Sequence, residues 1–309
     1  MANPNLGRVV LWMTGALFSF LASALAIRAL GKHLNVFEIL SIRSGFGLAV
    51  LLALIAIRPS LREELAFRHM GMHLARNTTH FLGQYLWALA VTLLPFATVF
   101  ALEFTTPAWV ALLAALLLHE RLTASRAGSV LLGFLGVVVI VRPGLESFQP
   151  MALLVLFAAL TFAVSLIVTK KLTGHVSTFT VIFWMNAMQL PIALAYPAFV
   201  AATGGPSLFV FRLGADSLLP LIVLGIVGLT SHYCLTSAFR SGDATVVVPL
   251  DFLRIPLVAL VGWLFYGEAL DGFVFAGAAL IVCGVLWNLQ AEARRSVAAS
   301  TEKAHAAEP

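Results

Sequence analysis

The chain has 309 residues, of which 61% are hydrophobic and only 11% are charged, and its mean hydropathy is +0.98. Soluble domains carry about 25% charged and about 45–50% apolar residues. This composition therefore excludes a soluble enzyme, a disordered protein and a nucleic-acid-binding domain. The two cysteines, Cys234 and Cys283, lie in separate apolar runs, so they predict neither a disulfide framework nor a metal cluster. We predict an integral membrane protein.

Apolar segments long enough to cross a bilayer occur along the whole chain. A transmembrane helix needs about 20 mostly apolar residues. Ten segments are predicted to be such helices: 9–27, 36–57, 74–94, 96–118, 124–141, 151–169, 176–202, 217–239, 244–267 and 272–290. The first is interpreted as a retained helix, because its apolar run exceeds a signal-peptide core and only Arg8 precedes it as a charge. The polar segment 291–309 is predicted to be a disordered cytoplasmic tail.

The basic residues between these segments are distributed unevenly. With a cytoplasmic N-terminus, most of them face the cytoplasm, and the outer loops contain only Arg28, Lys32, Arg142 and Arg212. Cytoplasmic loops are enriched in Lys and Arg. Both termini are therefore predicted to be cytoplasmic, and the pI of about 9.6 requires no nucleic-acid partner. The expected partners are the lipid bilayer and a small-molecule solute, with the chain a monomer or homodimer.

The two halves of the chain align with each other. Placing the fourth and fifth segments on the ninth and tenth pairs Tyr85 with Tyr233, Glu103 with Asp251, Glu120 with Glu268 and Gly136 with Gly284. Matched carboxylates are rare in apolar helices, so they indicate repeats of five helices, residues 1–146 and 147–290. Because five is odd, the second repeat is inverted. The predicted fold is all-α, with ten transmembrane helices in two inverted five-helix repeats. This pattern is typical of alternating-access transporters, with the substrate site near the midplane where the halves meet.

Two stretches carry a resemblance to a known family: FALEFTTPAWVALLAALLLHERL and VVVPLDFLRIPLVALVGWLFYGEAL. They resemble the two EamA repeats of the drug/metabolite transporter superfamily. The family's Gly-Glu at the end of the fourth repeat helix appears as Gly267–Glu268, and is His119–Glu120 in the first half. The resemblance covers nearly the whole chain. It implies a five-plus-five helix arrangement, a bacterial-type inner membrane location and transport of a small metabolite, such as an amino acid, sugar, nucleotide-like metabolite or vitamin.

Three charged residues lie in the middle of predicted helices, where a charge costs about 2.5–3.5 kcal/mol or more. Asp251 and Arg254 are three residues apart on one helical face, and the repeat symmetry places Glu103 opposite them. Two interpretations remain open. Arg254 binds an anionic group of the solute while Glu103 or Asp251 binds a proton or a cationic group, or the three residues form a permanent salt bridge that fixes helix packing.

A polar stripe is predicted on the third segment, because Arg76, His80 and Gln84 recur every four residues, with Tyr85 beside them. Such a stripe faces the bundle interior or a wet cavity. His80 is therefore a candidate proton relay, and the alternative is a hydrogen-bonded packing residue. Arg76 is alternatively interpreted as extending to the headgroups.

Further candidates for solute binding or coupling lie on other segments. His232 and Tyr233 occupy the corresponding positions of the eighth segment. Arg43 lies inside the second segment, where it either lines a vestibule or pairs with Glu38. Asn186 and Gln189 on the seventh segment are weaker candidates. Near the carboxylates, Pro107, Pro249 and Pro256 predict bent or locally opened helices.

No sequence motif for another class of chemistry is found. The chain has no glycine-rich phosphate loop and no nucleophile or zinc-protease motif, so no enzyme activity, cofactor or metal is expected. His69 and His73, although spaced for a metal, are interpreted as interfacial residues. We therefore predict a secondary transporter of a small polar or amphipathic metabolite, whose carboxylates allow proton coupling. An amino acid or derivative is the expected substrate, a riboflavin-like vitamin is the alternative, and a membrane enzyme or receptor is the alternative from another class.

Overall fold

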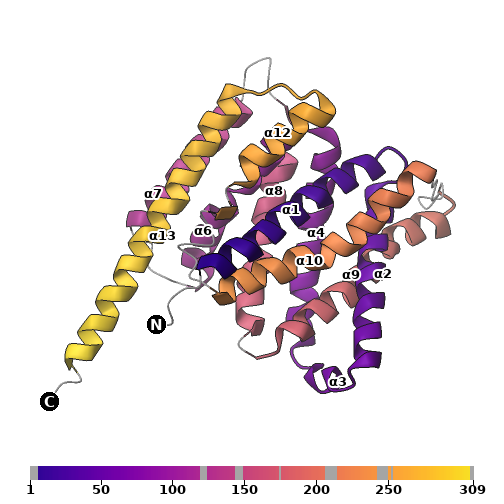
Figure 1. Cartoon of the computed structure of the whole chain (residues 1–309), viewed down its shortest axis with the longest axis horizontal. Helices are drawn as coiled ribbons and strands as arrows, with labels where there is room; N and C mark the ends of the chain where they lie inside the picture. Colours follow the sequence, from indigo (N-terminus) through magenta and orange to yellow (C-terminus); the bar gives the residue numbers. More distant parts are fainter. Residues whose placement is uncertain are drawn as a thin grey trace. The chain divides into compact units, whose positions relative to one another are not determined.

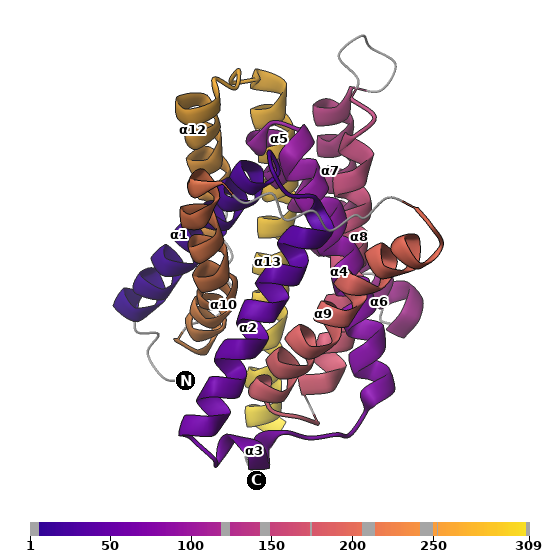
Figure 2. The same ribbon diagram turned by 90° about the vertical axis from the view of Figure 1, so that its right-hand side faces the viewer.

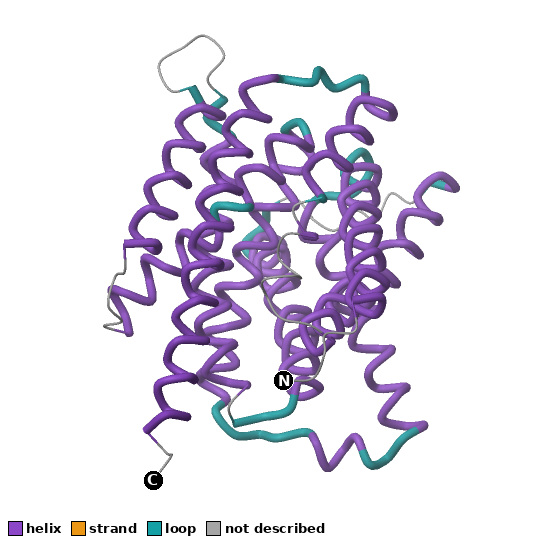
Figure 3. Tube along the Cα trace, turned by 60° about the vertical axis from the view of Figure 1, so that its left-hand side comes forward, coloured by secondary structure: helices purple, strands orange, loops and turns teal. Residues whose placement is uncertain are grey.

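The computed structural model describes residues 6–118, 124–142, 149–173, 175–205, 214–241, 250–251 and 253–306. Throughout this part of the chain the secondary structure is helical, without strands (Figures 1 and 3). The α-helices are α1 (Leu6–Leu30), α2 (Val36–Ile57), α3 (Leu61–Glu64), α4 (Met70–Leu93), α5 (Phe96–Glu103), α6 (Thr106–Leu118), α7 (Ala124–Val141), α8 (Ala152–Thr173), α9 (Thr178–Ala202), α10 (Leu218–Ser241), α12 (Arg254–Tyr266) and α13 (Gly272–Ala306), and a short 3-10 helix covers Ala215–Ser217.

Six of the described helices are long and apolar enough to cross a membrane. These stretches are Gly7–Leu30, Val36–Ile57, Ala152–Thr169, Thr178–Ala202, Leu218–Leu235 and Gly272–Ala291. They correspond to six of the ten predicted segments, so the count of ten is not confirmed. The third predicted segment is the continuous helix α4, but its Arg, Asn, Thr, His and Gln side chains lower its hydropathy. An all-helical fold of apolar helices is confirmed for the described residues.

The fourth predicted segment is two helices, α5 and α6, which agrees with the bent or locally opened helix predicted near Pro107. The break lies at Phe104 and Thr105, just before Pro107, whose ring nitrogen has no hydrogen to donate to the preceding turn. The side-chain hydroxyl of Thr105 donates to the carbonyl of Leu102 and that of Thr106 to the carbonyl of Glu103, both at 2.7 Å. In a continuous helix the Glu103 carbonyl would accept from residue 107, which is proline and has no N–H, so the Thr106 hydroxyl replaces that donor. The Leu102 carbonyl also accepts from the backbone N–H of Thr105 at 3.1 Å.

The last two predicted segments also differ from the structure. Residues 242–249, with Pro249, lie outside the described part, as do His119 and Glu120. α12 begins at Arg254, two residues before Pro256, which suits proline because the first helical turn has no amide partner to lose. α13 continues as helix to Ala306, whereas a disordered tail was expected after Gln290. Ala, Glu and Arg in this stretch are strong helix formers, which favours continuation of the preceding helix.

The chain divides into two compact units that each combine residues of both sequence repeats. The first unit comprises Met1–Thr14, Phe96–Gln149 and Cys234–Pro309, and the second comprises Gly15–Pro95 and Pro150–Tyr233. In the first unit α7 packs along α13, and α5 packs against α12. In the second unit α4 packs along α8, and α2 along α9 (Figure 2). The division into residues 1–146 and 147–290 concerns the sequence repeat and stays a prediction.

Close approach of glycine backbones fixes the α7–α13 pair in the first unit. A Cβ atom at Gly136 would lie 2.6 Å from the Gly277 carbonyl oxygen, and a Cβ at Gly277 would lie 2.6 Å from the Gly136 carbonyl oxygen. Helices in membranes associate through van der Waals packing rather than through water exclusion, so small residues that let backbones approach are favoured at their contacts. A side chain at either position would push the two helices apart.

In the second unit, α4 is held from both sides. A Cβ atom at Gly83 would lie 2.7 Å from the ring of Phe162 on α8, so α4 and α8 pack closely at this point. At the end of α4, the guanidinium of Arg28 donates to the backbone carbonyls of Val91 and Leu94. The last carbonyls of a helix lack amide partners, and a cation there is stabilising. These contacts position the polar face of α4.

Candidate functional site

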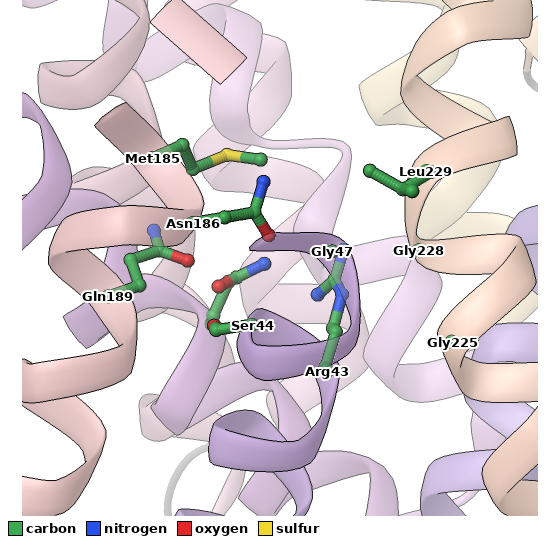
Figure 4. Close-up of a pocket in the computed structure, with 10 residues that line it drawn as sticks. Arg43, Ser44, Gly47, Met185, Asn186, Gln189, Gly225, Gly228 and Leu229 are labelled. Atoms are coloured by element: carbon green, nitrogen blue, oxygen red, sulfur yellow. The ribbon is translucent and has the colours of Figure 1, made fainter. Parts of the chain in front are cut away.

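A pocket in the second unit is surrounded by four helices, α2, α4, α9 and α10. Its lining residues are Arg43, Ser44, Gly47, Gln84, Met185, Asn186, Gln189, Gly225, Gly228 and Leu229. Figure 4 shows Asn186 and Gln189 projecting from α9 toward the polar side chains of α2, with the glycine-bearing face of α10 on the other side. Polar groups that converge in a concavity between apolar helices are typical of a solute site.

Two glycines make room for the polar side chains of this pocket. A Cβ atom at Gly47 would overlap the side-chain oxygen of Asn186, and one at Gly228 would lie 3.1 Å from Nε of Arg43. The residue on α2 that faces Asn186 and the residue on α10 that faces Arg43 are therefore both glycine, which leaves space for these two side chains. Larger residues at these positions would displace the guanidinium or the carboxamide.

Arg43 is the charged group of the pocket. Sequence analysis left open whether it pairs with Glu38, and the structure decides against this pairing. The carboxylate of Glu38 accepts from the backbone N–H of Asn35 at 2.8 Å, and the Asn35 side chain accepts from the Glu38 N–H at 3.1 Å, forming a capping box at the start of α2. Within the described part of the chain, no side chain forms a hydrogen bond or ion pair with Arg43.

The carboxamides of α9 are oriented by contacts at one end of each group. The Asn186 Nδ2 donates to the backbone carbonyl of Ile182 at 3.0 Å. The Gln189 Nε2 lies 2.9 Å from Nδ1 of His80, whose ring also packs 5.6 Å from that of Phe162. Each carboxamide thus keeps its oxygen and a second N–H hydrogen for the pocket. His80 acts here by orienting Gln189.

The polar stripe predicted on α4 separates into two parts. Gln84 lines the pocket, and Arg76 is 8% exposed. The Arg76 guanidinium donates to the Asn77 side-chain oxygen at 2.8 Å and to the Thr169 hydroxyl at 3.2 Å. Arg76 is therefore buried in helix packing and does not extend to the headgroups. The Asn77 amide donates in turn to the Trp184 carbonyl at 3.0 Å.

Two further predicted residues, Tyr85 and Tyr233, are not among the lining residues of the pocket. The ring of Tyr85 contacts that of Phe37, with 4.7 Å between centroids, and Phe37 also stacks on Tyr196. The side chain of Tyr233 is 63% exposed. The side chain of His232 lies outside the described part. Their assignment to solute binding stays a prediction.

The histidines His69 and His73 do not both lie at a surface. His73 is fully buried, and its ring lies 6.3 Å from that of Trp184. The ring of His69 lies 4.8 Å from that of His175. Among the described residues, His, Cys, Asp and Glu do not gather in groups of three or more able to hold a metal.

The first unit contains the predicted charged cluster. Nη2 of Arg254 lies 2.5 Å from Oδ2 of Asp251, and Nη1 lies 3.7 Å from Oε1 of Glu103. The rings of Phe100 and Phe104 lie 5.8 and 5.1 Å from the guanidinium carbon. The Arg254 side chain is 8% exposed and the two carboxylates 17% and 22%. The predicted contact between the three side chains is present.

Interrupted helices place this cluster. Glu103 is the last residue of α5, directly before the break at Phe104 and Thr105, and Arg254 is the first residue of α12. Because Arg254 already contacts two carboxylates, the cluster carries a net negative charge when all three groups are ionised. This favours binding of a proton or a cationic group over binding of an anion. In the second unit, Arg43 borders the pocket and pairs with no side chain that the structure describes.

Several pocket residues were not identified from the sequence: Ser44, Gly47, Met185, Gly225 and Gly228. The three-residue spacings Ser44–Gly47 and Gly225–Gly228 place small residues on one helix face, which was an available signal. It is weak, because the same spacing is common at helix contacts that bind no solute.

The family model of the EamA-like transporter family matches the chain twice, over residues 7–142 and 149–290. The chain belongs to the EamA-like transporter family. The two matches establish a tandem EamA repeat. The resemblance stated from the sequence is thereby confirmed, and with the six apolar helices it indicates a multi-pass protein of a bacterial membrane.

Similar proteins with curated names are transporters and not enzymes. A riboflavin transporter of Rhizobium johnstonii is 32% identical over 252 residues, which cover 81% of this chain and 80% of that protein. A riboflavin transporter of Brucella anthropi is 27% identical and covers 92% of this chain and 99% of that protein. An S-adenosylmethionine uptake transporter of Rickettsia bellii is 26% identical and covers 91% and 93%. An EamA transporter of small metabolites is the function class that these relatives support.

A solved crystal structure has the same fold. The match covers 94% of this chain and 98% of the chain in that structure, with a TM-score of 0.59 and 22% sequence identity. At this identity the match concerns the fold alone.

Proposed function

We propose that this EamA protein transports riboflavin or a closely related flavin across the bacterial inner membrane. The observation that carries this proposal is the 32% identity to the Rhizobium riboflavin transporter, supported by the Brucella relative and by one from Vibrio cholerae at 29%. Among the substrates expected from the sequence, these relatives favour the vitamin over a simple amino acid. Alternating access between the repeats 1–146 and 147–290 is the proposed mechanism.

S-adenosylmethionine is the second candidate, because the Rickettsia relatives of that name match over 91–92% of this chain. Riboflavin and S-adenosylmethionine share a nitrogen heterocycle bearing a hydroxylated chain or sugar. They differ in charge, since S-adenosylmethionine carries a cationic sulfonium and riboflavin is neutral. The Arg43 guanidinium, which pairs with no described side chain, favours the neutral solute at the pocket, because a cation there would be repelled.

Glu103, Asp251 and Arg254 are proposed to couple transport to a proton gradient. Their net negative charge allows one carboxylate to take up a proton without leaving Arg254 uncompensated. A transport cycle needs a group whose charge can change at low cost, and a carboxylate that shares its counter-ion with a second carboxylate meets this need. The orientation with both termini in the cytoplasm, and a monomeric or dimeric state, belong to the same proposal.

The experiment is solute counterflow with the purified protein in proteoliposomes. Vesicles loaded with unlabelled riboflavin should transiently accumulate labelled riboflavin, whichever direction the protein works in the cell. Excess S-adenosylmethionine should compete weakly, and arginine and leucine should not compete. Absence of counterflow with riboflavin refutes the proposal. Counterflow of labelled S-adenosylmethionine in its place would establish the second candidate.

A further inference from the structure

We propose that the pocket of the second unit binds the imide edge of the solute's heterocycle, a C(=O)–NH–C(=O) group. Arg43 donates to a carbonyl oxygen of this edge, and Asn186 accepts from its N–H. The inference rests on the proposed function and deepens it, because it assigns the part of the solute that is recognised and the residues that recognise it.

The charge of Arg43 is the first argument. A guanidinium in an apolar helix requires acceptors. Arg28, Arg76 and Arg254 each contact a protein oxygen at 3.7 Å or less, whereas no described side chain pairs with Arg43. Its guanidinium borders the pocket and lies beside the open face of Gly228. An oxygen of the solute is therefore the acceptor that this arginine lacks in the described protein.

Hydrogen-bond complementarity is the second argument. The oxygen of Asn186 extends over Gly47, where any side chain would overlap it, so this acceptor has a fixed place in the pocket. Gln84 and Gln189 add carboxamides, which each offer one acceptor and donors. An imide edge presents one N–H donor with one carbonyl acceptor on each side of it. A guanidinium together with carboxamides can satisfy all three groups.

Other polar groups fit the same residues less well. A carboxylate has acceptors only, and would leave the Asn186 oxygen facing another oxygen. An ammonium or sulfonium group would lie next to the Arg43 charge. A site that hydrogen-bonds one group of a solute discriminates strongly against a solute that lacks this group, because a buried polar group of the protein then stays unpaired.

The test is binding of riboflavin and of 3-methylriboflavin, in which the imide hydrogen is replaced by a methyl group. Full-length protein in lipid nanodiscs is titrated, and quenching of flavin fluorescence gives the dissociation constants. Loss of a buried hydrogen bond to a charged or carboxamide partner weakens binding by about tenfold or more. Wild-type protein should therefore bind 3-methylriboflavin about tenfold or more weakly than riboflavin.

The variants locate the edge. Arg43→Gln should weaken riboflavin binding by about tenfold or more, with partial recovery in Arg43→Lys. In Asn186→Leu the difference between riboflavin and 3-methylriboflavin should disappear. Arg294→Gln applies the same substitution at an exposed arginine and should bind like the wild type. Monodisperse elution and an unchanged melting temperature show that each variant is folded.

The outcomes separate this inference from the proposed function. Equal affinity of the wild type for the two flavins overturns the imide assignment, even where a variant fails to fold. Unchanged riboflavin binding in folded Arg43→Gln and Asn186→Leu overturns the assignment of the pocket. If riboflavin counterflow persists in these cases, only the pocket inference fails. If the wild type neither binds nor exchanges riboflavin, both are refuted.

Discussion

At the scale of single residues, the arginines of the apolar helices have different tasks. Arg254 contacts Asp251 and Glu103, and Arg76 donates to neutral oxygens within the helix packing. Arg43 has no such partner among the described residues, although it lines a pocket. The position of an arginine within a predicted helix thus indicates a polar function, but it does not show which arginine has a protein group as its partner. The partners decide this, and for Arg254 and Arg76 one of them, Glu103 or Thr169, comes from another helix.

The carboxylates of the charged cluster give the first prediction. Glu103→Gln and Asp251→Asn should each impair transport without preventing membrane insertion, because each removes a group that can take up a proton. Asp251→Asn should destabilise the protein more, because Asp251 lies 2.5 Å from Arg254 and Glu103 lies 3.7 Å away. Riboflavin counterflow at several pH values and thermal unfolding of the purified variants measure both effects. Full activity of both variants would refute the coupling role.

Removing the positive charge tests the packing interpretation that sequence analysis left open. Arg254→Met leaves two partly buried carboxylates uncompensated, which typically costs about 3–5 kcal/mol. The triple variant Arg254→Met, Asp251→Leu and Glu103→Gln removes all three charges together. It should recover much of the melting temperature that Arg254→Met alone loses. If the triple variant also transports with the wild-type dependence on pH, the cluster only fixes packing.

At the scale of helices, glycine contacts and proline breaks determine the geometry. α7 and α13 approach most closely at Gly136 and Gly277, where each backbone oxygen occupies the space of the other residue's absent Cβ. α5 ends at Glu103, four residues before Pro107, and the Thr106 hydroxyl donates to the Glu103 carbonyl in place of the amide that proline lacks. The charged cluster therefore lies at helix ends, with Glu103 at the end of α5 and Arg254 at the start of α12.

A substitution at the α7–α13 contact tests this account. Gly136→Val should lower the melting temperature markedly, because overpacking typically costs about 1–3 kcal/mol even before backbone oxygens are involved. The control is Gly272→Ala at the start of α13, where an added Cβ meets no atom within 4 Å. It should be neutral or slightly stabilising, because alanine favours helix. Equal melting temperatures for the two variants, measured by fluorescence-detected unfolding in detergent, would contradict the predicted contact.

At the scale of the whole molecule, the EamA repeat and the compact units divide the chain differently. The family matches are 7–142 and 149–290, while each compact unit takes residues from both. Helices that correspond in the two repeats, such as those containing Gly136 and Gly284, pack in one unit. Consecutive helices in the chain are thus distributed over both units.

The orientation in the membrane is a prediction at this scale. Because most basic residues lie in the segments assigned to the cytoplasm, both termini should face the cytoplasm. A green fluorescent protein fused after Pro309 should fluoresce, and alkaline phosphatase at the same site should be inactive. Alkaline phosphatase fused after Gln149, in a predicted outer loop, should be active. The reverse pattern would invert the assignment.

The sequence by itself determined the membrane class, the family and the repeat, and indicated the pairing of Arg254 with Asp251. The reason is that the length of an apolar helix, a repeated carboxylate and an i, i+3 spacing are local properties of the chain. Only the tertiary structure decided that no described side chain pairs with Arg43, and that Gly47 and Gly228 make room for the polar side chains of the pocket. These facts depend on side chains and backbones of four helices that are distant in sequence. No periodicity along a single helix encodes their approach.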